Sequence, residues 1–125
     1  MEDSPKEVLV VEDEPLVRIA AANALVDRGI MAREAGNASE ALQALDNHPQ
    51  IGVVFTDINM PGEPDGLGLA EQVSVERPDV EIIVTSGVRQ LRDEDLPDDG
   101  VFLAKPYTPE RLVQVVEQKL QGDPE

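Results

Sequence analysis

Short apolar runs rich in β-branched residues alternate along this chain with stretches of helical periodicity. Each run is short and has few polar interruptions, as expected of strands buried on both faces. Strands that alternate with helices favour right-handed crossovers, and therefore a doubly wound α/β fold with a parallel sheet and helices on both faces. The five predicted strands are Val8 to Val11, Ile30 to Arg33 (the weakest), Ile51 to Phe55, Ile82 to Thr85 and Val101 to Leu103.

The segments between these runs carry helix signals. Asn37 is a good N-cap, and Glu40 stands where it completes a capping-box-like pair. Thr108 and Pro109 open the last helix, because a capping hydroxyl precedes a proline at the first helical position. The second and third helices are expected to end by the prolines at positions 49 and 78. In the first helix, one face carries Leu16, Ile19, Ala20, Asn23 and Ala24. In the third helix it carries Leu69, Ala70 and Val73, and in the last helix Leu112, Val115, Val116 and Leu120.

The segment from Val88 to Leu96 is the weakest helical stretch. It is short, charged and closed by Pro97, so we expect one or two helical turns at most. The chain of 125 residues has no internal repeat and no linker. We therefore expect a single domain over residues 1–125, with a core from about 7 to 120 and frayed ends.

The composition argues against several classes of function. The formal net charge is −16, with 10 basic against 26 acidic residues, whereas nucleic-acid binders neutralise phosphates with Lys and Arg. We expect neither nucleic-acid nor membrane binding. The chain has no cysteine, so a disulfide framework and a thiolate metal site are excluded. No apolar run approaches the roughly 20 residues that span a bilayer, and the acidic start does not resemble a signal peptide, so we expect a cytoplasmic protein.

Polar side chains follow four of the five predicted strands. In an open parallel sheet, ligands bind beyond the carboxyl ends of the strands. We therefore expect these side chains to converge on one rim of the sheet. Glu12 and Asp13 follow the first strand, and Asp57 stands at the end of the third. Thr85, Ser86 and Gly87 stand at the end of the fourth strand, and Lys105 and Pro106 at the end of the fifth.

The chemistry of this set indicates phosphoryl transfer. Carboxylate oxygens suit Mg²⁺, which commonly sits on a few carboxylates, waters and phosphate oxygens. The metal would offset the mutual repulsion of Glu12, Asp13 and Asp57, and would leave one carboxylate able to attack phosphorus. Lysine and hydroxyl donors would then hold the arriving oxygens.

In this order and at these spacings, the residues resemble the response-regulator receiver domain of two-component signalling, a CheY-like family. The resemblance covers about residues 7 to 120 and rests on Glu12-Asp13, Asp57 in FTDINMP, Ser86-Gly87 and Lys105-Pro106. It implies a five-stranded sheet in the flavodoxin-like order 2-1-3-4-5. It also implies that Asp57 accepts a phosphoryl group from the phosphohistidine of a sensor histidine kinase or a phosphotransfer protein. Such a domain is a phosphoacceptor that assists its own phosphorylation and dephosphorylation rather than an enzyme.

The resemblance implies a set of metal ligands. Glu12, Asp13 and Asp57 would hold Mg²⁺, with the backbone carbonyl of Asn59 as a further ligand. Alternatives from the residues themselves stay open: Asp13 could cap the first helix, and Glu12 could act through water. Asn59 and Val88 fall where side chains tune the lifetime of the acyl phosphate.

The resemblance also implies a switch. Ser86 would close onto the phosphoryl group, Lys105 would pair with it, and Gly87 would leave room beside it. Thr85 competes with Ser86 for this role, but we expect Thr85 to point into a helix layer. Phe102 falls at the family's rotating aromatic position, although an aromatic residue there could simply be part of the core.

Two departures from the family pattern affect the expectations. The loop MPGEPDG is one residue longer than usual, and the chain from Ser86 to Lys105 is short by about one helical turn, so the fourth helix is expected to be short or irregular. The peptide bond between Lys105 and Pro106 is expected to be cis. We expect a downstream protein target to bind the surface from residue 86 to 107, formed by Val88, Leu91, Leu96, Phe102 and Tyr107.

Other readings of the chain remain. It could be a pseudo-receiver that works without phosphorylation, or less readily an aspartyl-phosphate hydrolase of the haloacid-dehalogenase type, although that motif carries an aspartate where this chain has Asn59. A flavodoxin-like binding module would need a phosphate-cradling loop after the first strand, where this chain has the acidic VEDEPL. We expect a stand-alone receiver, monomeric or weakly dimeric, with a piece of a larger hybrid kinase or regulator as the alternative.

Overall fold

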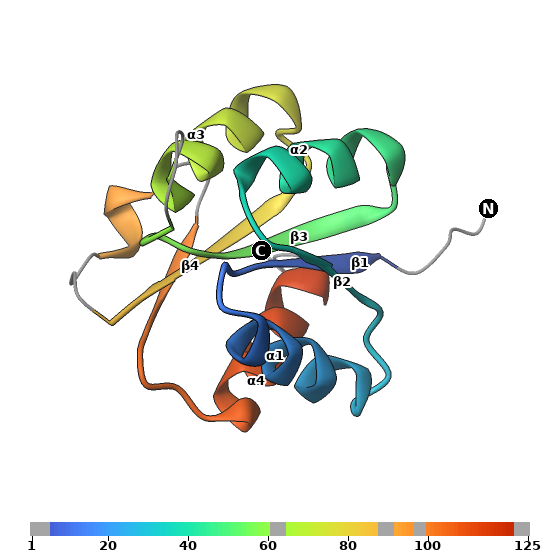
Figure 1. Cartoon of the computed structure of the whole chain (residues 1–125), viewed down its shortest axis with the longest axis vertical. Coiled ribbons are helices and arrows are strands. Elements are labelled where there is room, and N and C mark those ends of the chain that lie inside the picture. The colour runs from blue at the N-terminus through green and yellow to red at the C-terminus, as the bar shows by residue number, and fades with distance from the viewer. Residues whose placement is uncertain (1–5, 61–64, 88–91, 97–99, 122–125) are drawn as a thin grey trace.

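The computed structural model describes residues 6–60, 65–87, 92–96 and 100–121. Five parallel strands form one sheet in the order β2-β1-β3-β4-β5 (Figure 1), which confirms the predicted doubly wound α/β fold. The strands are β1 (Glu7–Val11), β2 (Ala32–Ala35), β3 (Ile51–Asp57), β4 (Glu81–Ser86) and β5 (Val101–Ala104). The helices are α1 (Pro15–Val26), α2 (Ala38–Asn47), α3 (Gly66–Glu76) and α4 (Pro109–Gln121).

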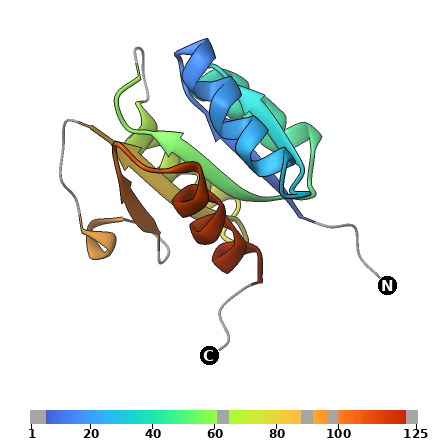
Figure 2. The ribbon, with the colours of Figure 1, turned by 90° about the horizontal axis from the view of Figure 1, so that it is seen from below.

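The helices cover the sheet in two layers. Helices α2 and α3 lie on one face, and α1 and α4 lie on the other (Figures 1 and 2). Because side chains alternate along a strand, Leu9 and Val11 of β1 join the α2/α3 core, whereas Val8 and Val10 join the α1/α4 core. The central strands are therefore buried on both faces, which explains their nearly continuous apolar runs.

The predicted helix starts are confirmed. Asn37 Oδ1 accepts a hydrogen bond from the Glu40 amide at 2.8 Å, and Glu40 Oε1 accepts one from the Gly36 amide at 2.7 Å. Helix α4 begins at Pro109, and Thr108 Oγ1 accepts a hydrogen bond from the Arg111 amide at 3.0 Å. The amides of Glu40 and Arg111 belong to first helical turns, which leave them without an intrahelical partner. Gly36 precedes the N-cap Asn37, so the return bond from Glu40 lies one residue before the place expected for a capping box.

Helix α1 packs through a different face from the one expected. Leu16 is 82% exposed and Ile19 is 41% exposed, whereas Ala21, Ala22 and Leu25 are buried against the sheet. Both sides of this helix are apolar, so hydrophobic periodicity alone does not distinguish them. The small alanine side chains allow the helix to lie close to the strands, and the larger Leu16 and Ile19 remain outside.

Strand β2 begins two residues later than the predicted run from Ile30 to Arg33. Gly29 adopts a left-handed φ of 81°, and the Ile30 amide donates a hydrogen bond to the Leu25 carbonyl at 3.0 Å. This arrangement ends α1 in the manner of a glycine C-cap. Ile30 is therefore part of the helix terminus, where its side chain is buried in the α1/α4 core.

The segment between β4 and β5 contains, in its described part, the 3₁₀ turn Asp93–Asp95. This agrees with the short or irregular helix that was expected between Ser86 and Lys105. Asp93 Oδ1 accepts a hydrogen bond from the Phe102 amide of edge strand β5 at 2.9 Å. Val88 and Leu91, the insertion in the loop at residues 61–64, and the chain ends at 1–5 and 122–125 lie outside the described residues. Within the described ranges, no helix combines the length and apolarity that a membrane crossing requires.

Candidate functional site

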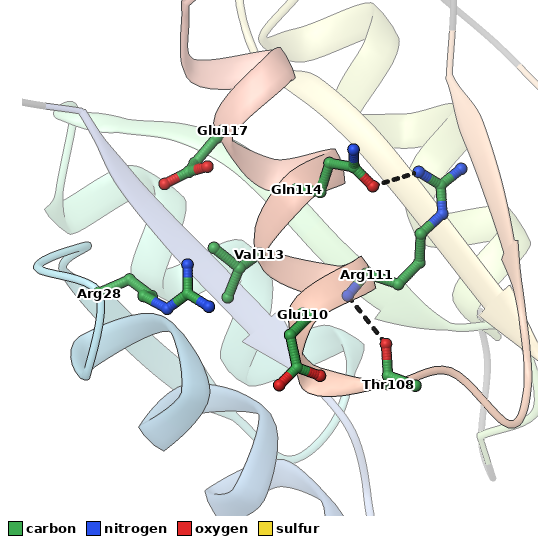
Figure 3. Close-up of a pocket in the computed structure, with 7 residues that line it drawn as sticks. All are labelled: Arg28, Thr108, Glu110, Arg111, Val113, Gln114 and Glu117. Carbon is green, nitrogen blue, oxygen red and sulfur yellow. Dashed lines mark hydrogen bonds between the residues drawn. The ribbon is translucent and has the colours of Figure 1, made fainter.

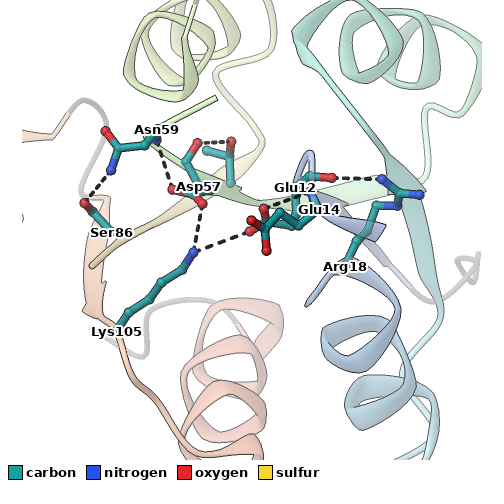
Figure 4. A network of polar contacts seen from close by, with 8 residues as sticks. Glu12, Glu14, Arg18, Asp57, Asn59, Ser86 and Lys105 are labelled. Carbon is teal, nitrogen blue, oxygen red and sulfur yellow. Dashed lines mark hydrogen bonds and ion pairs between the residues drawn. The ribbon is translucent and has the colours of Figure 1, made fainter. Parts of the chain in front are cut away.

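Asp57 is the last residue of β3 and lies at the rim formed by the carboxyl ends of the strands. The residue is only 6% exposed, and both oxygens of its carboxylate have partners. Oδ1 accepts a hydrogen bond from the Asn59 amide at 2.9 Å, and Oδ2 lies 2.8 Å from Lys105 Nζ (Figure 4). These contacts offset the cost of removing the carboxylate from water.

Gly66, the first residue of α3, packs directly against the end of β3. Its amide donates a hydrogen bond to the Ile58 carbonyl at 3.0 Å. A methyl group on residue 66 would overlap the Asp57 carbonyl oxygen, so this close approach requires glycine. The sequence contained Gly66 only as the end of a loop motif, and its packing role was not predicted.

Glu12 and Asp13 lie beside Asp57 and form the predicted acidic cluster. Oxygens from the three carboxylates lie within 4.8 Å of one another. Burial raises the pKa of Glu12 to about 7; the Glu14 amide and Lys105 act against this shift, and Asp57 adds to it. Glu12 Oε2 accepts the hydrogen bond from the Glu14 amide at 3.1 Å. This set of oxygen donors fits a divalent cation such as Mg²⁺.

The alternative in which Asp13 caps helix α1 is not supported. The N-cap of α1 is Glu14, and Pro15 is the first helical residue. Asp13 is half-buried beside the other two carboxylates. Its position therefore agrees with the expected ligand role rather than with capping.

Lys105 supplies the positive charge of the site. Its Nζ atom lies 2.8 Å from Asp57 Oδ2 and 3.5 Å from Glu12 Oε1. Burial opposes the charged form, but the attraction of Asp57 and Glu12 outweighs this effect and raises the pKa of Lys105. The bond between Lys105 and Pro106 is cis, as expected. A methyl group on Gly87 would stand 3.4 Å from Lys105 Cβ, so Gly87 leaves space beside the lysine stem.

Ser86 is the buried last residue of β4. Its side chain contacts Asn59, and this contact was not predicted from the sequence. Asn59 Nδ2 donates a hydrogen bond to Ser86 Oγ at 2.9 Å. Ser86 pairs in register with Ala104, two residues beyond Phe102 on the neighbouring strand. Phe102 is half-buried and packs against the α2/α3 core, on the face to which Ser86 also belongs by strand alternation.

Thr85 points into the α1/α4 layer, as expected. It pairs in register with Asp57, and its residue is 2% exposed. Alternation along β4 places it on the same face as Ile83, which belongs to the α1/α4 core. Thr85 and Ser86 therefore lie on opposite faces of the sheet.

Arg18 of helix α1 holds the acidic loop, which is the connection between β1 and α1 at residues 12–14. This role was not predicted from the sequence. Its Nη1 atom donates a hydrogen bond to the Glu12 carbonyl at 2.9 Å (Figure 4). Its Nε atom lies 3.0 Å from Glu34 Oε1. The guanidinium therefore joins the first turns of α1 to the end of β1 and to β2. The only sequence signal for this role is that Arg18 is the single charged residue of helix α1.

In the part of the chain that the structure describes, two surface hollows are lined by residues of helix α4. One is polar, and charged residues of both signs line it: Arg28 and Arg111 with Glu110 and Glu117. In Figure 3 the side chains of Arg28, Glu110 and Glu117 lie on one side of α4, and the Arg111 side chain points to the other side, where it donates a hydrogen bond to Gln114. The other is an apolar groove between α1 and the start of α4, lined by Leu16, Val17, Ala20, Ala24, Tyr107 and Pro109 among others. The groove is the more unusual feature, because exposed apolar surface of this kind often marks a contact with another protein.

Tyr107 connects the apolar groove to the acidic site. Its ring packs edge-on against Phe55, with centroids 5.7 Å apart and an interplanar angle of 79°. Burial raises the pKa of the Tyr107 hydroxyl; Lys105 opposes this shift, and Glu12 and Asp57 add to it. Tyr107 therefore lines the groove and lies near enough to the charged residues of the site for them to affect its pKa.

Comparison with known proteins identifies the family. The family model for the response regulator receiver domain matches residues 8–117. The receiver domain of NtrX from Brucella abortus superposes with a TM-score of 0.84 at 30% identity, covering 94% of this chain and 100% of that one. A response regulator receiver protein from Pseudomonas putida gives a TM-score of 0.81 at 34% identity, covering 94% and 99%. This chain belongs to the response regulator receiver domain family of two-component signalling.

Curated relatives differ widely in length. The sensor kinase CckA of Brucella abortus is 34% identical over 118 residues, which are 91% of this chain and 12% of the kinase. The response regulator receiver protein CpdR of the same organism is 31% identical over 118 residues, covering 92% of this chain and 97% of CpdR. The chain thus spans nearly all of one relative and a small part of the other.

Proposed function

We propose that Asp57 accepts a phosphoryl group from a phosphohistidine of a sensor histidine kinase or a phosphotransfer protein. The observation that carries this proposal is the position of one buried carboxylate at a strand end, 2.8 Å from Lys105 and beside Glu12 and Asp13. In the transfer, an Asp57 oxygen forms a bond to phosphorus. The bond between phosphorus and the histidine nitrogen breaks, and the nitrogen keeps the electron pair.

The residues around Asp57 are suited to hold the incoming group. Glu12, Asp13, Asp57 and the backbone carbonyl of Asn59 would hold Mg²⁺, which supplies positive charge to the phosphoryl oxygens when it is bound. Lys105 would move its ammonium from Asp57 to a phosphoryl oxygen. Most of the catalytic effect in such a reaction comes from positioning and electrostatic stabilisation. In this way the chain would assist its own phosphorylation and dephosphorylation.

The switch proposed for this site starts at Ser86. Its hydroxyl would leave Asn59 and donate to the phosphoryl group, and Phe102 would follow on the same face of the sheet. A phosphoryl group can shift this equilibrium only through a difference in affinity for the two arrangements. The output surface would then lie around edge strand β5, where Leu96 and Phe102 pack on the α2/α3 side and Tyr107 on the opposite side. A downstream protein would read this surface.

The phosphodonor is proposed to dock on the apolar groove between α1 and α4. Leu16 is exposed there, and Tyr107 joins the groove to the acidic rim. A protein that covers this groove would bring a histidine to the rim at Asp57. The mixed charges of the hollow in Figure 3 provide no comparable preference for one partner.

Phosphotransfer profiling tests this function. A panel of radiolabelled histidine kinases and phosphotransfer domains is mixed with the wild-type chain and with Asp57→Asn in Mg²⁺. Label should move to the wild-type chain from at least one donor and not to the variant. Equal transfer to both proteins would exclude Asp57 as the acceptor. The same conclusion would follow if no donor labelled the wild-type chain and acyl phosphates also failed to label it.

A further inference from the structure

A buried hydroxyl next to the phosphoacceptor has no role in the site described above. Thr85 is 2% exposed, and within the described ranges its Oγ1 atom has no hydrogen-bond partner. A buried polar atom without a partner is costly, and such atoms are rare in folded proteins. Valine would fill the same volume without that cost. The hydroxyl therefore calls for an explanation in another state of the protein.

The strand register places this hydroxyl beside Asp57. Thr85 of β4 and Asp57 of β3 are direct partners in the parallel ladder. Both residues face the α1/α4 layer, because Phe55 and Ile83, two residues earlier on each strand, belong to that core. Neighbouring strands are about 4.8 Å apart. A threonine hydroxyl on one strand can therefore reach a carboxylate oxygen on the next after rotation about one side-chain bond.

In the present structure, both carboxylate oxygens of Asp57 have partners other than Thr85. Oδ1 is occupied by the Asn59 amide, and Oδ2 is occupied by Lys105 Nζ. Phosphorylation would change this pairing, since Lys105 would then bind a phosphoryl oxygen. This step rests on the proposed function. Asp57 Oδ2 would then lose Lys105 as a partner, and Thr85 carries a hydroxyl on the same face of the sheet that has no bond within the described ranges.

We propose that the Thr85 hydroxyl donates a hydrogen bond to Asp57 during hydrolysis of the acyl phosphate and so shortens the life of the phosphorylated state. In this hydrolysis, a water oxygen bonds to phosphorus and the bond between phosphorus and the Asp57 oxygen breaks. The electron pair of that bond stays on Asp57 as a carboxylate charge, and the proton of the water passes to the released phosphate or to solvent. A donor that favours the charged carboxylate over the ester oxygen stabilises this transition state.

The test compares four proteins that differ by single atoms or groups. The wild-type chain, Thr85→Val, Thr85→Ser and Thr56→Val are loaded with acetyl phosphate in Mg²⁺, freed of the donor, and followed by intact mass. Thr56 is a matched control, because it is fully buried on β3 but its hydroxyl already donates to the Asp57 backbone carbonyl at 3.1 Å. Urea unfolding of the four unphosphorylated proteins is measured in parallel.

The expected lifetime of the phosphorylated state is about fivefold longer in Thr85→Val than in the wild type, because one hydrogen bond to a developing charge is lost. Thr85→Ser and Thr56→Val should stay within about twofold of the wild type. Thr85→Val should unfold at a urea concentration no lower than the wild type, whereas Thr56→Val should unfold at a lower one.

Three outcomes would overturn the inference. The first is an unchanged lifetime in Thr85→Val, and the second is an equal lengthening in Thr56→Val. The third is a loss of stability in Thr85→Val as large as that in Thr56→Val, since the hydroxyl would then already be bonded before phosphorylation. A wild-type chain that takes no label from acetyl phosphate or from any protein donor contradicts the proposed function instead, so the two failures are distinguishable.

Discussion

The side-chain amide of Asn59 donates a hydrogen bond to Ser86 Oγ across the rim of the site, at 2.9 Å. Asn59 thus serves the site twice, because its backbone amide also binds Asp57 Oδ1. In the unphosphorylated protein, Ser86 is held by a residue of the β3–α3 connection. The closure proposed for Ser86 would move its hydroxyl away from Asn59 and break this bond.

The Asn59→Ala variant should close more readily than the wild type. Loss of the hydrogen bond removes a contact that exists only in the open arrangement, and a typical net value of about 1 kcal/mol corresponds to about fivefold tighter binding of a phosphoryl mimic. Titration with beryllofluoride at fixed Mg²⁺, followed by NMR, measures this affinity. Ser86→Ala should bind the mimic more weakly than the wild type, and weaker binding by Asn59→Ala would show that the bond does not restrain closure.

Stability without Mg²⁺ should depend on pH through Glu12. The pKa of Glu12 is raised from 4.5 to about 7, mainly by burial, so the folded protein binds more protons than the unfolded chain between these values. This contribution to stability is fully present below the unfolded pKa and is lost as pH rises through the folded pKa. We expect the free energy of unfolding to fall by roughly 2–3 kcal/mol over this interval.

Glutamine at position 12 provides the control for this pH dependence. Glu12→Gln keeps the shape of the side chain but cannot ionise, so its stability curve should lack the fall assigned to Glu12. Urea unfolding from pH 4 to 8 in a chelator, at matched ionic strength, gives both curves. Parallel curves for the two proteins would mean that Glu12 is not the group responsible.

The packing of Gly66 against Asp57 predicts a large effect from one methyl group. Gly66→Ala would overlap the Asp57 carbonyl oxygen, and the shift needed to relieve this overlap should cost about 3 kcal/mol. Gly29→Ala is the control, because its φ of 81° disfavours alanine although no atom lies within 4 Å, and it should cost about 1 kcal/mol. If urea unfolding gives equal losses for the two variants, the contact between α3 and β3 is looser than the structure indicates.

Arg18 should matter for metal binding even though it is not a ligand. Arg18→Gln removes the donor that holds the Glu12 carbonyl, so the acidic loop should lose its fixed position and Mg²⁺ affinity should drop about fivefold. Arg33→Gln changes the net charge equally, but Arg33 pairs with Glu7 at the opposite end of β1. Isothermal titration with Mg²⁺ should show little change in this control. Equal losses would assign the effect to net charge alone.

Two exposed apolar residues give a matched test of the docking groove. Leu16 on α1 is 82% exposed and Val75 on α3 is 80% exposed, but only Leu16 lines the groove beside Tyr107. Leu16→Gln should slow phosphotransfer from a protein donor by about tenfold, a typical effect of losing one apolar anchor, and leave the rate with acetyl phosphate unchanged. Val75→Gln should change neither rate. A slower reaction of Val75→Gln with the protein donor would move the docking surface to α3.

The sequence was sufficient to predict the strand ends but not the contacts between them. Asp57 and Lys105 could be placed on one rim because parallel strands present their carboxyl ends together. The buried face of α1 could not be predicted, since Leu16 and Leu25 lie on different sides of a helix that is apolar on both. The bond from Asn59 to Ser86 depends on the packing of two distant loops, and no local pattern records such a contact.

Asp57 is proposed as the phosphoacceptor, and the surrounding carboxylates are proposed to make its reaction depend on metal. Borohydride reduction converts an aspartyl phosphate to homoserine, which peptide sequencing by mass spectrometry then locates. After treatment with acetyl phosphate, we expect homoserine at position 57 alone, and only when Mg²⁺ is present. Homoserine at another aspartate, or equal conversion of Asp57 in a chelator, would contradict this account of the site.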